Sequence, residues 1–181
     1  QLGMASLLPG NKRAINTADG NAPVTVDGSS ASGTDNRDKI LKTYADGRGT
    51  AIQAEDFLNL ATSTEGAELT KNNDLIVIYH NRIDRIGDKR ESEADTCIAV
   101  EKAFDDLELI LRKISSLKGS QAVITADHGF LFQQEPVDAN DRSEFPKAEE
   151  LTIKKKRFAI GSDIQAATGQ KIFTAEQLKL E

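Results

Sequence analysis

The sequence predicts an α/β domain with mostly parallel strands, and three features in the middle of the chain predict it. Residues 75–79 and 122–126 are short, continuous runs of largely apolar and β-branched residues, which is typical of strands covered on both faces. Between them, residues 92–117 place apolar side chains at alternating spacings of three and four, the pattern of an amphipathic helix. A strand, a helix and a strand in this order form a right-handed crossover between parallel neighbours.

Short elements are predicted before this unit. Residues 23–27 form a β-type run between turn residues, which predicts a short strand or hairpin on the surface. Apolar residues at helical spacing predict a helix over 37–46 and another over 53–60, which 64–71 extends after a break. The side chains expected to face inward are Ile40, Leu41 and Tyr44 in the first helix and Phe57, Leu58 and Leu60 in the second.

The long helix predicted over 92–117 carries a single apolar stripe. Ser92 with Asp95 is expected to cap its start, and Lys118 with Gly119 its end. Cys97 is the single cysteine of the chain, so we expect no disulfide, and its place on the stripe predicts a buried small side chain. The stripe consists of Cys97, Val100, Phe104, Leu107, Leu111 and Ile114.

Little regular structure is predicted after residue 130. Residues 133–150 are polar and contain prolines, which indicates a long excursion over the surface. Residues 158–161 predict a further strand. Thr174 with Gln177 forms a capping-box pattern, which predicts a last short helix.

Composition and charge limit the classes of function. A chain of 181 residues is long enough for one α/β domain, so residues 1–181 are taken as a single domain. The formal net charge of −6 argues against non-specific binding of nucleic acid, because such binding depends on Lys and Arg side chains that neutralise the phosphates. Chemistry on a phosphate would therefore need bound cations. No apolar run approaches the roughly 20 residues of a membrane span, and we expect a soluble protein of the cytoplasm without membrane partners.

The first candidate site residues follow the strand predicted over 75–79. Ligands of open α/β sheets bind at the carboxyl ends of parallel strands, and His80, Asp84 and Asp88 stand there. Asp84 and Asp88 are four residues apart and lie on one side if the segment is helical. Their carboxylates are candidate metal ligands, with His80 as an accessory one. In the plain alternative, the two carboxylates pair with neighbouring basic residues, namely Arg82, Arg85 or Lys89.

The second group of candidate ligands, Asp127 and His128, follows the strand predicted over 122–126. An Asp and a His side by side can coordinate two neighbouring Zn²⁺ or Mn²⁺ ions, while Gly129 lets the backbone turn sharply. In the plain alternative, Asp127 caps the following turn and His128 bonds to a backbone carbonyl. Other chemistries lack their signatures, because the chain has no nucleophile elbow, no Gly-rich phosphate loop and too few cysteines for a zinc finger.

Five segments in order resemble PglZ proteins. They are Leu-Gly-Met-Ala-Ser-Leu-Leu-Pro at 2–9, Gly-Thr-Asp-Asn-Arg at 33–37, Ala-Glu-Asp-Phe at 54–57, Ile-Tyr-His-Asn-Arg-Ile-Asp-Arg-Ile-Gly-Asp at 78–88, and Thr-Ala-Asp-His-Gly-Phe-Leu-Phe-Gln at 125–133. The likeness covers most of the chain. The ordered set is specific, whereas Asp-His-Gly alone would only be suggestive.

This resemblance implies a fold and a metal site. The fold would be a partial doubly wound, mostly parallel sheet of the alkaline phosphatase type. Two divalent metal ions, Zn or Mn, would activate a Ser or Thr nucleophile against a phosphoester. By position, Asp127 and His128 match the metal-binding Asp-His pair of the superfamily, and Asp84 matches a metal-ligand Asp. Asp88 stands where many relatives have a His; His80 could compensate for it as a ligand, and a hydrogen-bonding role for His80 is the alternative.

The resemblance also implies a biological role. PglZ proteins belong to bacterial phage-resistance systems, notably BREX, and act beside a DNA methyltransferase and other defence proteins. We expect the intact protein to be a metal-dependent phosphatase or phosphodiesterase, with DNA as one candidate substrate. No catalytic residue is assigned here, because the family's nucleophile precedes the Leu-Gly-Met segment and is expected upstream of Gln1. The chain is thus expected to be truncated on that side and on the C-terminal side, and inactive alone.

Two other functions stay open at this stage. One is a non-catalytic scaffold that retains the phosphatase fold and docks other defence proteins, which the Asp in place of a His at position 88 suggests. The other is a small-molecule phosphomutase or sulfatase relative that uses the same metal frame.

Overall fold

The computed structural model describes residues 2–16, 23–87, 95–130, 138–141, 150–154 and 158–180. The chain divides into two compact units, each considered by itself. Residues Gly33–Thr125 form the sheet unit, and residues Gln1–Ser32 with Ala126–Glu181 form the hairpin unit. The single domain expected over 1–181 stays a prediction.

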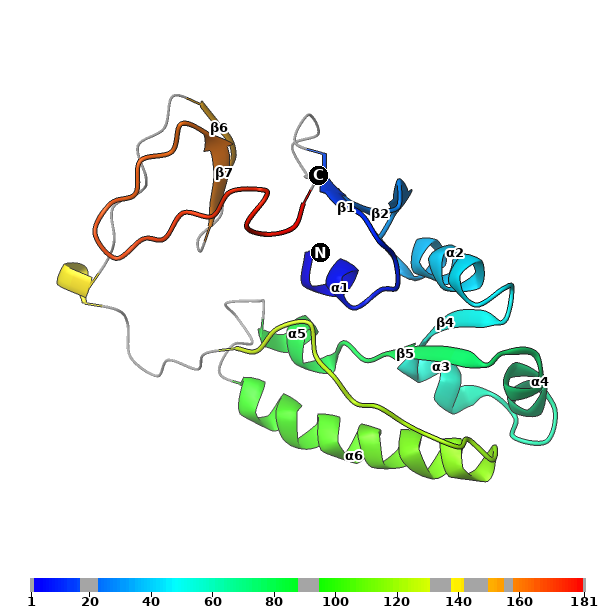
Figure 1. The fold of residues 1–181 in the computed structure, drawn as a ribbon. Coiled ribbons are helices and arrows are strands. Elements are labelled where there is room, and N and C mark those ends of the chain that lie inside the picture. Colours follow the sequence, from blue (N-terminus) through cyan, green and yellow to red (C-terminus); the bar gives the residue numbers. More distant parts are fainter. Residues whose placement is uncertain are drawn as a thin grey trace. The chain divides into compact units, whose positions relative to one another are not determined.

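The sheet unit is built on two parallel strands. β4 (Gly49–Gln53) pairs with β5 (Leu75–Tyr79) in parallel register, with the first residues of the two strands opposite each other. Two helices, α3 (Ala54–Asn59) and α4 (Glu65–Asn72), connect them, and α2 (Thr34–Tyr44) packs on β4 (Figure 1). The unit is therefore mixed α/β with a small parallel sheet. The strand predicted at 75–79 is confirmed.

The sequence did not predict β4. Ile52 is its one large apolar residue, so the segment lacks a strand pattern of its own. Pairing with β5 makes it a strand, because the β5 backbone supplies the hydrogen-bond partners.

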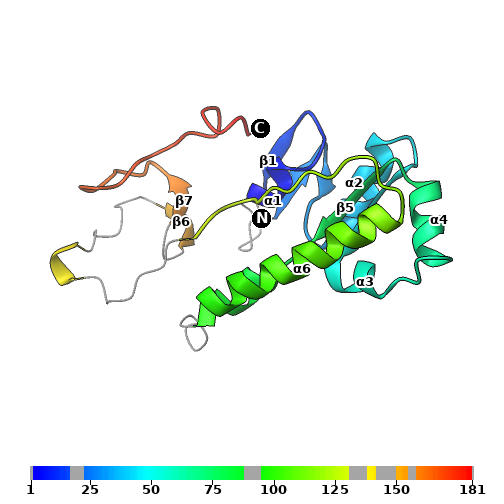
Figure 2. The same cartoon turned by 90° about the horizontal axis from the view of Figure 1, so that it is seen from below.

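The core of the sheet unit lies between α3 and α6 (Thr96–Ser116), a single long helix (Figure 2). Lys113 of α6 ties the two together by donating from Nζ to the carbonyl oxygens of Leu58 and Leu60, 2.7 Å and 2.5 Å away. It thus satisfies carbonyl groups at the C-terminal end of α3, where a positive charge is favourable. The buried core residues are Ala54, Phe57, Ile110 and Leu117, with Leu58, Leu60 and Ile114 packed against them.

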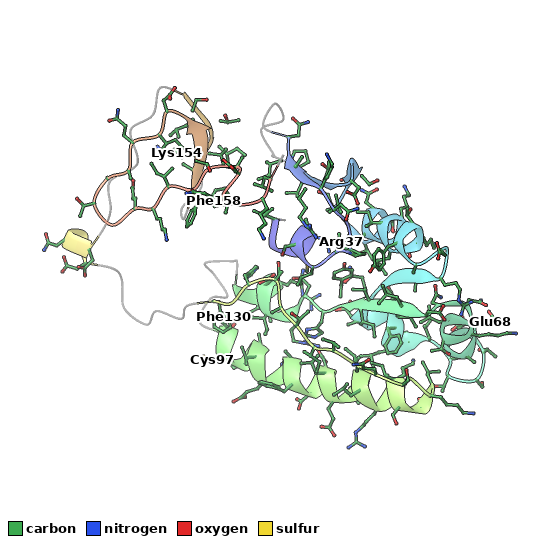
Figure 3. All side chains as sticks on the ribbon, viewed as in Figure 1. Arg37, Glu68, Cys97, Phe130, Lys154 and Phe158 are labelled. Atoms are coloured by element: carbon green, nitrogen blue, oxygen red, sulfur yellow. The ribbon has the colours of Figure 1, made fainter. Side chains whose placement is uncertain are left out.

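The face that α6 buries differs from the predicted stripe. The small residues Ala99 and Ala103 are buried together with Ile110, and they lie about a quarter turn away from the stripe. Phe104 is 68% exposed, and Cys97 at the start of α6 is exposed as well (Figure 3), so the prediction was wrong for both. The physical reason is fit, since small side chains let a helix approach its neighbours closely. Leu111 of the stripe and Tyr44 of α2 are likewise exposed, against prediction, whereas Ile40 and Leu41 are buried as expected.

The strand predicted at 122–126 does not form. This segment is drawn as coil in Figure 2, and its Val123 and Ile124 side chains are 79% and 61% exposed. A β-branched run favours a strand, but a strand also needs a neighbour for its backbone hydrogen bonds. Within the described residues, β5 pairs with β4 and the segment pairs with no strand. The predicted end of α6 is confirmed, because the Gly119 N–H donates to the Ile114 carbonyl oxygen, 2.9 Å away.

The hairpin unit contains a small antiparallel sheet of β1 (Arg13–Ile15), β2 (Val24–Val26) and β3 (Ser29–Ser30), with the short helix α1 (Leu2–Ser6) against β2. The hairpin predicted around 23–27 is confirmed. Its expected surface position was wrong for Val24 and Val26, which are buried.

The rest of this unit holds a second antiparallel pair, β6 (Glu150–Lys154) with β7 (Ala159–Ser162), and a short 3-10 helix, η2 (Ala139–Asp141). The strand predicted at 158–161 is thereby confirmed. Most of the predicted excursion over 133–150 lies outside the described residues.

The capping box near the C-terminal end forms as predicted. The Thr174 N–H donates to Gln177 Oε1 and the Gln177 N–H donates to Thr174 Oγ1, over 3.0 Å and 3.2 Å. The segment forms turns and not the expected helix. Among the described helices, none is both long and apolar enough to span a bilayer.

Candidate metal centre

A hydrogen-bonded cluster lies where β5 ends. His80 directly follows the strand, Arg82 opens α5 (Arg82–Gly87), and Asp106 comes from α6. Asp106 Oδ2 lies 2.8 Å from His80 Nε2 and 2.6 Å from Arg82 Nε, while Arg82 Nη2 donates to Asp106 Oδ1 over 3.1 Å. The side chains of His80, Asp106 and Arg82 are 19%, 18% and 29% exposed, so water is largely kept from these contacts.

The charges of this cluster set the state of its groups. The hydrogen bond from Arg82 holds the pKa of the Asp106 carboxyl below its usual value against the effect of burial, and His80 adds to the lowering. An ionised carboxylate only accepts hydrogen bonds, so His80 donates from Nε2. In the tautomer that donates from Nε2, Nδ1 carries the lone pair.

Asp84 lies in the first turn of α5 and is partly buried. Arg82 is bound to Asp106, and Arg85 Nη1 lies 3.3 Å from Glu55 Oε1. Both arginines of α5 thus have carboxylate partners of their own, while the expected pairing of Asp84 with a basic neighbour stays a prediction. Asp88 and Lys89 lie outside the described residues.

Two further side-chain pairs line the carboxyl end of the sheet. The guanidinium carbon of Arg37, which projects from α2 (Figure 3), lies 4.8 Å from the centre of the Tyr79 ring. Burial raises the pKa of the Tyr79 hydroxyl, and the charge of Arg37 opposes this only in part. At the end of β4, Gln53 Nε2 donates to Thr34 Oγ1 over 2.5 Å. Helix α2 is therefore anchored to the ends of both strands.

Asp127 and His128 belong to the hairpin unit, in the coil at 126–130. Asp127 Oδ2 lies 3.7 Å from His128 Nε2, and their side chains are 15% and 56% exposed. His128 Nδ1 lies 3.1 Å from the carbonyl oxygen of Gly129, which can only accept, so Nδ1 donates there. In the neutral ring the lone pair is then on Nε2. Gly129 does not adopt the left-handed conformation that would require glycine, so the expected sharp turn is not found.

Asp127 packs directly on α1. A Cβ added to Gly3 would lie 2.7 Å from the Asp127 carbonyl oxygen and 3.2 Å from its Cβ, so only glycine allows this approach. Arg13 holds the end of the same helix, because its Nε and Nη2 donate to the carbonyl oxygens of Ala5 and Leu8 over 3.2 Å and 2.8 Å. Gly3 and Arg13 thereby support the segment that carries Asp127.

Asp127 and His128 lie close enough to take part in one metal centre. Zinc binds nitrogen and oxygen ligands at roughly 2.0–2.2 Å, so two ligands of one ion lie about 3–4 Å apart. The 3.7 Å between Asp127 Oδ2 and His128 Nε2 falls in this range. Among the described residues, no group of three or more Asp, Glu, His or Cys side chains is placed so that it could hold a metal ion. Convergence of Asp84 with Asp127 and His128 stays a prediction.

Three residues with a role in this geometry were missed by sequence reasoning: Gly3, Arg13 and Asp106. Asp106 stands among acidic residues on an amphipathic helix, and nothing local distinguishes it from Asp105. Its partners lie 24 and 26 residues away. Gly3 offered a weak signal, since glycine within a helix is unfavourable and calls for a packing reason.

Comparison with known proteins places the chain in a family. The family of the BREX system PglZ alkaline phosphatase-like domain matches residues 1–179. The alkaline phosphatase-like protein BrxZ of Escherichia coli is 40% identical over 168 residues, which cover 92% of this chain and 19% of that protein. The alkaline phosphatase-like protein PglZ of Bacillus cereus is 35% identical over 179 residues, or 97% of this chain and 20% of that protein.

The chain spans about a fifth of the length of these curated relatives. No solved structure gives a significant match. A family match along nearly the whole chain, together with two relatives that align over more than nine tenths of it, decides the assignment. The chain therefore belongs to the PglZ family, the alkaline phosphatase-like domain of BREX systems.

Proposed function

We propose that the full-length protein is the PglZ component of a BREX-type phage-resistance system and hydrolyses phosphoesters with the help of two divalent metal ions, Zn or Mn. Phosphodiesters, DNA among them, are the proposed substrate class, and other BREX proteins are the proposed partners. The doubly wound sheet of the alkaline phosphatase type is part of this proposal. The observation that carries it is the pair of donors on Asp127 and His128, 3.7 Å apart, within a chain that matches this family from residue 1 to 179.

The proposed ligands have the chemistry that such ions require. Asp127, His128 and Asp84 offer carboxylate oxygen and imidazole nitrogen, which suit Zn²⁺ and Mn²⁺, and Asp88 is proposed as a further ligand. His128 Nδ1 donates to the Gly129 carbonyl oxygen, and Nε2 lies on the side of Asp127, 3.7 Å from its Oδ2. When bound, two such ions would stabilise negative charge on the attacking and leaving oxygens of a phosphoester.

The remaining described residues contribute by holding these ligands. Gly3 lets the Asp127 backbone approach α1, and the burial of the Asp127 side chain limits its motion. His80 and Arg82, which lie four and two residues before Asp84 in the sequence, both bind Asp106, and these contacts restrain the start of α5. The nucleophile of the reaction is proposed to lie in a part of the full-length protein outside this chain.

The test uses the full-length protein and two variants, Asp127→Ala and His128→Ala. Loss of an outer partner of a metal ligand costs about 10–100-fold in affinity or activity, so loss of a ligand itself should cost more than about 100-fold. Elemental analysis gives the metal content, and hydrolysis of bis(p-nitrophenyl) phosphate and of linear DNA gives the activity. Asp141→Asn, which removes an exposed carboxylate of the same unit, is the control and should match the unchanged protein. Full metal content and activity in both alanine variants would refute the proposal.

A second candidate, the non-catalytic scaffold, is favoured by the absence of a complete ligand set among the described residues. It predicts that the full-length protein purifies folded, without stoichiometric metal, and still binds other BREX proteins. Elemental analysis of the unchanged protein separates the two functions.

A further inference from the structure

Asp106 joins two parts of the sheet unit that are far apart in the sequence. It stands within α6, while its partners His80 and Arg82 lie where β5 ends and α5 begins. We infer that Asp106 is a positioning residue of the metal centre, which fixes the His80 ring so that it is held ready for a cation, and which holds the first turn of α5 in place. This inference rests on the proposed function.

The geometry of the contacts restrains both partners. Arg82 meets the carboxylate with two nitrogens, Nε on Oδ2 at 2.6 Å and Nη2 on Oδ1 at 3.1 Å. Such a paired contact sets the plane of the guanidinium as well as its position. His80 Nε2 meets the same Oδ2 at 2.8 Å, which fixes the direction of the imidazole. The Asp106 carboxylate therefore orients the side chains of His80 and Arg82, which are two positions apart in the sequence.

The orientation has a chemical consequence for His80. Because Nε2 donates to Asp106, Nδ1 is the nitrogen that remains for a cation. A carboxylate that accepts from the second nitrogen of an imidazole is the usual support of a metal-binding histidine, since it fixes the tautomer and raises the ligand's basicity. Asp106 fills this role in the sheet unit, and its limited exposure protects the contact from water.

The rival explanation is a purely structural ion pair that ties α5 to α6. It accounts for Arg82, since α5 packs on α6 and an arginine needs one carboxylate partner. It accounts for His80 only as a partly buried polar group that needs a hydrogen-bond partner. Stability alone does not separate the two explanations, because both expect some loss when the carboxylate is removed. Metal affinity does separate them.

The experiment titrates the metal-free full-length protein with ZnCl₂ by calorimetry and records thermal unfolding in parallel. Asp106→Asn keeps the shape of the side chain but removes its charge, and we expect Zn²⁺ to bind about 10–100-fold more weakly. Asp105→Asn is the matched control, because it removes the same charge from an exposed position on the same helix. Its Zn²⁺ affinity should equal that of the unchanged protein.

A second variant keeps the inference testable if Asp106→Asn fails to fold. His80→Ala leaves the Arg82 pair with Asp106 in place and should also weaken Zn²⁺ binding. In the double variant the two losses should combine to less than their product, because both remove the same oriented imidazole.

The outcomes distinguish the inference from the proposed function. If the unchanged protein binds no Zn²⁺, the proposed function fails and this inference falls with it. If it binds Zn²⁺ and loses binding with Asp127→Ala, but Asp106→Asn and His80→Ala bind as tightly as Asp105→Asn, only the positioning role is overturned. A lower unfolding temperature with unchanged Zn²⁺ affinity would leave Asp106 as a structural tether.

Discussion

The sheet unit and the hairpin unit hold their candidate ligands in different ways. In the sheet unit, His80 is anchored by a charged hydrogen bond to Asp106 of α6, about one helical turn before the core residue Ile110. In the hairpin unit, Asp127 rests on Gly3 through backbone packing, and more than half of the His128 side chain is exposed. His80 is thus held by a side chain of α6, whereas Asp127 is held by close backbone packing against α1.

This difference shows that a strand paired within a sheet fixes the position of the site residues that follow it. β5 is paired, so the residues after it leave the sheet from a fixed point and can meet a side chain of α6. The run at 122–126 has the composition of a strand but no partner among the described residues, and the Asp-His pair follows a coil. The second group of ligands is therefore not positioned by a paired strand in the part of the chain that the structure describes.

Substitutions in the two cores should show the largest difference between the units. Phe57→Ala removes a fully buried ring and should cost about 3–5 kcal/mol of unfolding free energy. Val26→Ala in the hairpin unit removes two buried methyl groups and should cost about 1.5 kcal/mol, at about 0.8 kcal/mol per group. Urea unfolding followed by circular dichroism measures both. If the units unfold separately, each substitution shifts only one transition, whereas equal shifts of one shared transition would erase the distinction between them.

A smaller effect is expected where Asp127 meets α1. Gly3→Ala places a Cβ 2.7 Å from the Asp127 carbonyl oxygen, so the backbone must move, at a cost of about 1–3 kcal/mol. The same variant of the full-length protein should bind Zn²⁺ more weakly, because Asp127 is displaced. Gly129→Ala is the control, since its Cβ would meet no atom within 4 Å and its backbone conformation suits any residue. Equal behaviour of the two variants in thermal unfolding would show that Gly3 does not support Asp127.

The smallest effect, about 1 kcal/mol, is expected from a pH-dependent contact of the sheet unit. Asp38 Oδ1 accepts from Thr50 Oγ1 and the Ala51 N–H, at 2.7 Å and 3.0 Å, and Lys42 Nζ lies 2.7 Å from Oδ2. Burial raises the pKa of the Asp38 carboxyl, but the hydrogen bonds from Lys42, Ala51 and Thr50 together hold it below its usual value.

A lowered pKa means that Asp38 stabilises the fold above the unfolded pKa of about 3.9 and loses this effect as the pH falls through the folded pKa. The unfolding temperature of the unchanged chain should therefore exceed that of Asp38→Asn by a constant amount from pH 7 to pH 5. Below about pH 4 the two curves should converge. A difference that persists at pH 2 would show that the charge of Asp38 is not what holds α2 to β4.

Several local features were predictable from the sequence. The β-branched run at 75–79 is β5, the hairpin around 23–27 exists, and Thr174 and Gln177 cap each other as their spacing indicates. The position of His80 at the carboxyl end of a parallel strand followed from the same reading. The roles of Asp84, Asp127 and His128 as ligands rest on the family resemblance and stay predictions.

The buried face of α6 shows where local patterns were insufficient. The stripe around Phe104 has the larger apolar side chains, yet the helix turns Ala99, Ala103 and Ile110 inward. Periodicity shows that a helix has an apolar side, but the shape of the neighbouring elements decides which side fits against them.

The sequence by itself determined a few features that depend on neighbouring residues: the β-branched strand at 75–79, the hairpin around 23–27, the end of α6 and the Thr174–Gln177 capping box. Only the tertiary structure decided that Gly49–Gln53 joins β5, that 122–126 remains coil, and that Asp106 meets His80 and Arg82. The physical reason is range. The β4–β5 pairing and the contacts of Asp106 join groups more than 20 residues apart, and their energy depends on a packing arrangement that no local spacing encodes.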